Sequence, residues 1–229
     1  MILAYHFLLR EYTGDFKEMF SQLMDKDTLG DALRKRYETW SSRVFIEAPL
    51  ILLAHNNAVL LWKVCNIFVW LALALSLMYL THYKNITMLI GLILMYPVTD
   101  MASAGWIATY INYLWPLTAG CISVIALDKM YYDKKIYFPE AVMYLLLELF
   151  ATNFETFGVM YVCILLWYIG NLWYEKKIRF KKVCFWILQM VVALGNVIFA
   201  LTCPGTFIRK QEEVGRWMKD FAQWTVVDK

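Results

Sequence analysis

The sequence carries little charge for its length. Only 18% of its 229 residues are Asp, Glu, Lys or Arg, whereas an average soluble domain has about 25%. Hydrophobic residues make up 61% of the chain and aromatic residues 17%. A soluble fold of this size needs polar side chains to cover its core, so the composition indicates that lipid covers much of the surface. Disorder, a coiled coil, a disulfide scaffold and a nucleic-acid-binding domain are disfavoured, and no nucleic-acid partner is expected.

The sequence also lacks the motifs of several enzyme classes. Its three histidines are scattered without metal-ligand spacing, and no C-x-x-C pair is present. No Walker-type loop, G-x-S-x-G or G-x-G-x-x-G occurs either. We therefore predict no cofactor and no metal ligand, leave open a dependence on a divalent metal, and do not expect ATP-driven transport by this chain.

Long runs without charge predict membrane-spanning helices, each of which needs about 20 mostly apolar residues. The expected fold is an all-α polytopic membrane helix bundle, with a short loop or re-entrant segment at about 98–113. The bundle is assigned to residues 63–203, between an N-terminal segment (1–62) and a tail (204–229). Six spans are predicted, at about 64–81, 85–99, 114–127, 138–153, 156–174 and 183–203.

The basic residues predict an orientation for this bundle. The loops 82–86, 128–138 and 175–182 hold nine Lys and Arg residues in all, whereas the opposite loops 98–113 and 152–155 hold none. Because basic residues are enriched in cytoplasmic loops, we expect a multi-pass protein of the cell membrane. The N-terminal segment and the tail would then both be extracytoplasmic.

The expected outer segments show helical periodicity. Apolar residues recur at helical spacing from Phe16 to Met24, from Leu33 to Val44 and from Val214 to Phe221. The second helix is expected to open near Thr28 and Asp31. Such amphipathic helices lie in the membrane interface, so membrane lipid is a predicted partner and simple anchoring is one interpretation.

Polar and aromatic residues that gather on this side are the candidate site residues. Glu148 is added because a carboxylate within a span is costly and indicates function by default, although a packing role is the alternative. Its spacing of seven residues from Glu155 places both on one face if a single helix continues through them. The other candidates are Asp15, Arg43, Asp100, Asn112, Tyr113, Trp115, Glu155 and Arg209.

These residue types suit a membrane site that handles a phosphorylated sugar. A carboxylate can act as a general base on a hydroxyl group, and arginine binds phosphate through a bidentate fork. Tryptophan and tyrosine present a flat face and a polar tip to an amphipathic ligand.

The order of several short motifs resembles a family of bacterial multi-pass membrane proteins related to the GT-C glycosyltransferases and the O-antigen glucosyltransferases. The motifs are Gly14-Asp15-Phe16, the segment from Tyr37 to Arg43, Asn112-Tyr113-Leu114-Trp115-Pro116, Asn153-Phe154-Glu155, and Pro204-Gly205 followed by Arg209. They resemble the family's "DD(Y/F)", "W-S-G-R", "N-Y-L-W" and "P-G-N" motifs, with Gly14, Ser42 and Thr206 as departures.

The resemblance implies a transferase that uses a polyprenyl-phosphate-linked sugar and a cell-surface glycan acceptor on the outer face. It implies that Asp15 is the base and that Arg43 is the arginine of the second motif. Family members have more spans, so we expect a shortened or fragmentary member. A non-catalytic membrane subunit, a small solute or lipid carrier, and an inactive fragment are the alternative interpretations.

Overall fold

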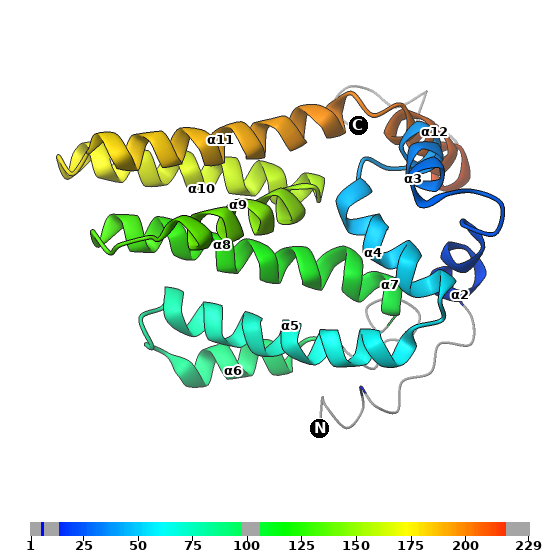
Figure 1. The fold of residues 1–229 in the computed structure, drawn as a ribbon, viewed down its shortest axis with the longest axis horizontal. Helices are drawn as coiled ribbons and strands as arrows, with labels where there is room; N and C mark the ends of the chain where they lie inside the picture. Colours follow the sequence, from blue (N-terminus) through cyan, green and yellow to red (C-terminus); the bar gives the residue numbers. More distant parts are fainter. Residues whose placement is uncertain (1–5, 7–13, 98–105, 219–229) are drawn as a thin grey trace.

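The computed structural model describes residue 6 and residues 14–97 and 106–218. Every regular element in these described residues is a helix, which confirms the all-α class. Long helices lie side by side and form a bundle, and shorter helices cover one end of it (Figure 1).

Four helical segments are long and apolar enough to cross a membrane. They are α5 (Val59–Leu80), the continuous segment Ile107–Tyr131, α10 (Glu155–Tyr174) and α11 (Phe180–Leu201). The second comprises α7 (Ile107–Thr109), the π-helical turn η2 (Tyr110–Leu114) and α8 (Trp115–Tyr131). Each overlaps a long charge-poor run, which is the feature that predicted it. One boundary was wrong: residues 107–113, expected within the loop or re-entrant segment at about 98–113, are helical and extend the third predicted span at its N-terminal end.

The other two predicted spans correspond to shorter helices. α6 (Ile86–Leu94) has 9 residues and α9 (Phe138–Thr152) has 15. At about 1.5 Å per residue, α6 covers roughly half of a hydrocarbon core about 30 Å thick. Four helices of crossing length are therefore present in the described residues, and the six-span arrangement stays a prediction.

The chain reverses direction repeatedly along the bundle. As a result, the connections at 81–85, 132–137 and 175–179 lie together at one end of the bundle (Figure 1). We call this the basic end, because the three predicted basic loops lie there. The expected grouping of these loops is thus present in the fold, whereas the side of the membrane they face stays a prediction.

The opposite end is covered by a helical cap. The cap consists of α2 (Asp15–Glu18), the 3₁₀ turn η1 (Phe20–Gln22), α3 (Leu29–Thr39), α4 (Val44–His55) and α12 (Pro204–Trp217). α3 begins as predicted, because the Thr28 side chain accepts a hydrogen bond of 3.2 Å from the Asp31 backbone N–H. α12 packs against α3, so the last described helix joins the cap that the N-terminal segment forms.

The N-terminal amphipathic pattern folds differently from the prediction. The single helix expected over 16–24 is divided into α2 and η1, and the helix expected to reach Val44 ends at Thr39. Phe16 and Phe20 are both buried in one apolar core with residues of α4. The apolar side chains that were expected to contact lipid therefore pack against α4 instead.

The turn between α9 and α10 corrects another expectation. α9 ends at Thr152 and α10 begins at Glu155, so Glu148 and Glu155 do not share a face of one continuous helix. The two helices run in opposite directions (Figure 1). This turn leaves Glu148 inside the bundle, whereas Glu155 lies under the cap.

Candidate functional site

The link between α3 and α4 meets the start of α10 under the cap. The Arg43 Nε donates a hydrogen bond of 3.0 Å to Glu155 Oε2, and the Ser42 hydroxyl donates one of 3.2 Å to Glu155 Oε1. Glu155 is the first residue of α10, a position where the helix dipole favours negative charge. Both oxygens of this carboxylate are therefore bound by the segment that the second motif occupies.

Two aromatic rings surround the Arg43 guanidinium. Its central carbon lies 5.5 Å from the ring centre of Tyr113 and 4.8 Å from that of Phe154. Burial opposes the charge, but Glu155 and Tyr113 more than offset this, so the pKa of Arg43 lies above its ordinary value. The Arg43 side chain is 13% exposed and that of Glu155 is 25% exposed. Arg43 is therefore a partly accessible cation in an aromatic setting.

Asn153 fixes this geometry from the α9–α10 turn. Its Oδ1 accepts a hydrogen bond of 2.9 Å from the Phe45 backbone N–H, and its Nδ2 donates one of 3.1 Å to the Ser42 carbonyl. Asn153 is buried, which strengthens the requirement that its amide be satisfied. The Arg43–Glu155 pair is thus held by backbone contacts on both sides.

Three of the residues predicted for the site come together here: Arg43, Tyr113 and Glu155. Asp15 is exposed at the start of α2, and α2 packs against α4 and α7. Asp100 lies outside the described residues.

The other two candidates of the motif at 112–116, Asn112 and Trp115, make their hydrogen bonds elsewhere. The Asn112 amide donates to the carbonyl of Ala108 one turn earlier, at 2.9 Å. The Trp115 indole N–H donates to Asn66 Oδ1 of α5, also at 2.9 Å. Both side chains therefore serve helix and bundle packing.

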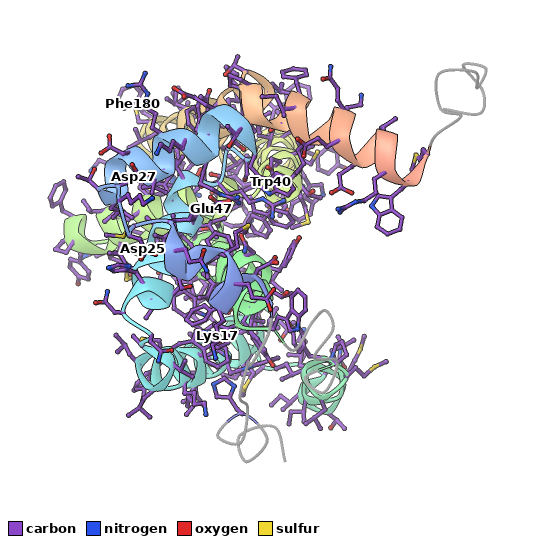
Figure 2. All side chains as sticks on the ribbon, turned by 90° about the vertical axis from the view of Figure 1, so that its right-hand side faces the viewer. Lys17, Asp25, Asp27, Trp40, Glu47 and Phe180 are labelled. Carbon is purple, nitrogen blue, oxygen red and sulfur yellow. The ribbon has the colours of Figure 1, made fainter. Side chains whose placement is uncertain are left out.

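Arg209 lies on α12 near another part of the cap. Its guanidinium carbon is 5.9 Å from the ring of Trp40, the residue that follows α3. Trp40 lies near the middle of the cap when the molecule is viewed from that end (Figure 2). Arg209 thus contacts the motif segment through Trp40.

Glu148 is fully buried in the bundle beside the Gln189 amide. Neither of its carboxylate oxygens makes a hydrogen bond of ordinary geometry, and Gln189 Oε1 also lacks one. The Tyr161 hydroxyl nearby accepts hydrogen bonds from Ser123 at 3.0 Å and from Gln189 at 3.1 Å. Glu148 therefore belongs to a polar cluster inside the bundle and is separate from the cap site.

A buried ion pair in the cap, between Arg36 and Glu47, escaped the sequence prediction. Arg36 of α3 donates two hydrogen bonds to Glu47 of α4, of 2.8 Å and 2.9 Å. Its guanidinium also lies over the rings of Phe20 and Trp40. The usable signal was the lone carboxylate of Glu47 within the apolar run 44–54, since a carboxylate among apolar residues needs a cationic partner.

Among the described residues, no group of three or more His, Cys, Asp or Glu side chains is placed to hold a metal ion. The arrangement under the cap instead offers an arginine, a carboxylate at a helix start, and two rings. These groups can bind an anionic, amphipathic ligand and accept a proton.

Comparison with known protein families, curated proteins and solved structures found no match to the chain. The class of protein is therefore defined by the fold itself. It is a helical bundle with four helices of membrane-crossing length and apolarity in its described part, covered at one end by a cap that contains the ion pairs Arg36–Glu47 and Arg43–Glu155.

Proposed function

We propose that the chain is a multi-pass membrane protein of the glycosyltransferase type, whose cap faces the extracytoplasmic side. It would bind a polyprenyl-phosphate-linked sugar there and transfer the sugar to a cell-surface glycan. The observation that carries the proposal is the contact of Arg43 with Glu155, 112 positions away in sequence, beside the Tyr113 ring.

Arg43 is the proposed ligand of the donor phosphate. In the free protein its charge is balanced by Glu155 at 3.0 Å. A phosphate carries equal or greater negative charge and fits the guanidinium fork, so it can replace the Glu155 carboxylate on Arg43. The rings of Tyr113 and Phe154 then flank the bound headgroup.

Asp15 is the proposed general base. Its carboxylate is exposed on a cap helix, where an acceptor glycan arriving from water can reach it. In the transfer step, the acceptor oxygen attacks the anomeric carbon of the sugar while its proton passes to Asp15. The bond between that carbon and the phosphate oxygen breaks, and polyprenyl phosphate leaves with the electron pair.

The base is tested by replacing Asp15 with Asn in protein purified with its bound lipid. Glu18→Gln is the matched control, because Glu18 is an exposed carboxylate on the same helix. We expect Asp15→Asn to lower sugar transfer from a polyprenyl-phosphate donor by about 10²–10⁴-fold, and Glu18→Gln to leave it unchanged. Equal transfer by both variants would refute the role of Asp15.

The phosphate site is tested with Glu155→Gln and Arg43→Met. Glutamine keeps the shape of the side chain but releases the charge of Arg43, so donor binding should tighten and KM should fall. Arg43→Met should raise KM for the donor, by about tenfold or more for a lost charge-assisted hydrogen bond. If both variants bind the donor as the unaltered protein does, Arg43 does not hold the phosphate.

A non-catalytic membrane subunit is the second candidate function. The hydrogen bonds of Arg43 and Ser42 to Glu155, and of Asn153 to Ser42, favour this alternative, because they join the cap to the bundle. Under this alternative, Arg43→Met loosens the cap and increases its cleavage by protease, while no sugar transfer is measured for any form of the protein.

A further inference from the structure

Four polar side chains meet in the interior of the bundle, one from each of four helices. They are Ser123 of α8, Glu148 of α9, Tyr161 of α10 and Gln189 of α11, and all four are fully buried. The sugar transfer proposed for the cap uses none of these groups, so their presence inside an apolar bundle needs an explanation of its own.

Hydrogen bonds link three of the four side chains. Gln189 Nε2 donates one of 3.1 Å to the Tyr161 hydroxyl, which lies 3.0 Å from the Ser123 hydroxyl. Ser123 is also within 2.8 Å of the Gly120 carbonyl. The network therefore runs from α11 through α10 to α8, where it ends on the backbone.

The packing of α11 on α9 holds Gln189 against Glu148. Both helices run from the basic end towards the cap (Figure 1) and pack against each other. The Gln189 amide lies beside the Glu148 carboxyl group. Two turns later on α11, Asn196 Nδ2 donates to the Leu149 carbonyl at 2.9 Å and to the Thr152 hydroxyl at 2.7 Å. One face of α11 thus contacts α9 at both levels.

The contact between Glu148 and Gln189 lacks a hydrogen. Both carboxyl oxygens of Glu148 and the Oε1 of Gln189 are buried without a hydrogen-bond partner. An ionised carboxylate and an amide carbonyl are acceptors only, so neither can satisfy the other. These atoms have almost no accessible surface, and the missing donor must therefore be one that needs no open cavity. A proton on the carboxyl group meets both requirements.

The helices around α9 offer no charged group that could balance an ionised Glu148. α9 packs against α4, α8, α10 and α11, and the titratable side chain that faces Glu148 from them is Tyr161, which is neutral as a phenol. In the described part of these helices and of α9, the other acidic and basic side chains lie in the cap or at the basic end. They are Glu47, His55, Asp128, Lys129, Glu140, Glu155, Lys181 and Lys182.

We propose that Glu148 is a proton-binding site, whose neutral carboxyl group donates a hydrogen bond to Gln189 Oε1. The proton is taken up from water and is held at neutral pH while the bundle is folded. It completes one chain of hydrogen bonds from Glu148 through Gln189 and Tyr161 to Ser123, and so it joins α9, α11, α10 and α8. Interior carboxyl groups form the proton relays of membrane pumps and transporters.

Infrared spectroscopy of the full chain in detergent micelles tests this at neutral pH. We expect a C=O stretching band of a protonated carboxylic acid, which is lost in Glu148→Gln and kept in Glu212→Gln. Glu212 is the control because it is exposed on α12 in the cap. The absence of this band from the unaltered protein, or its survival in Glu148→Gln, would overturn the proposal.

Gln189→Leu tests the partner and does not depend on the folding of Glu148→Gln. Leucine removes the amide that accepts the hydrogen bond, so the carboxylic acid band should change its frequency. A band at the same frequency in Gln189→Leu would show that the proton of Glu148 is not donated to Gln189.

The pH dependence of unfolding separates proton binding from simple packing. A glutamate in the unfolded chain ionises at about pH 4.3, so above this pH unfolding of the protein would release the proton of Glu148. Relative to Glu148→Gln, the unfolding equilibrium constant of the unaltered protein should therefore rise by up to about tenfold for each pH unit above about 5. An equal pH dependence of the two proteins would refute the assignment.

Discussion

The buried pair of Arg36 and Glu47 predicts how the cap responds to the loss of one charge. The side chains are 10% and 4% exposed and are joined by two hydrogen bonds of 2.8 Å and 2.9 Å. Glu47→Leu leaves the Arg36 guanidinium buried without its counter-charge. Removing one partner of such a pair is destabilising by about 3–5 kcal/mol, because the remaining charge has lost its hydration and its partner together.

The assay measures unfolding of the cap. Denaturant is added to detergent-solubilised protein, and the fraction of unfolded cap is read from its cleavage by a soluble protease. The double variant Arg36→Met/Glu47→Leu is the matched control, because it removes the buried charge as well as the pair. We expect Glu47→Leu to lower the free energy of cap unfolding by about 3 kcal/mol or more and the double variant to regain most of that loss. A loss below about 1 kcal/mol in Glu47→Leu, or additive losses in the double variant, would refute the reasoning.

Three further substitutions test other contacts. Gly205→Ala would place a Cβ 2.2 Å from the Trp40 backbone nitrogen, so α12 should separate from α3 and become more sensitive to protease; an unchanged cleavage pattern would contradict this. Trp115→Phe removes the donor to Asn66 and should lower the free energy of unfolding by about 1–3 kcal/mol, whereas no change in thermal unfolding would show that the bond is dispensable. Glu148→Gln removes a buried carboxylate without a hydrogen-bond partner and should leave the thermal midpoint equal or higher; a marked fall would show that the carboxylate is bound.

The long helices could be predicted because one physical requirement determines them. A run of about 20 residues without charge is suited to lipid and to little else, and α5, α8, α10 and α11 follow such runs. The cap was harder to predict from the sequence, because its short helices depend on contacts between distant segments. The division of residues 16–24 into two elements follows from packing on α4, which periodicity alone does not contain.

The candidate site was predictable only in part for a geometric reason. The alternation of spans and basic loops placed Arg43, Tyr113 and Glu155 on one side of the bundle, and the structure brings these three together. Asn112 and Trp115 belong to the same motif as Tyr113, but this motif lies on a continuous helical segment, where successive side chains point in different directions around the axis. Neighbours in the sequence of a helical motif therefore face different partners, and a shared motif does not imply a shared site.

The turn at 153–154 explains why two glutamates seven residues apart have such different chemistry. A continuous helix through this point would place Glu148 and Glu155 in similar surroundings. Because α9 ends at Thr152, Glu155 instead starts α10, where it gains the favourable end of the helix dipole and the Arg43 guanidinium. Glu148 stays where no hydrogen bond reaches its oxygens. The hydrogen bonds of Asn153 to the cap hold this turn, so Asn153 helps to keep Glu155, and not Glu148, beside Arg43.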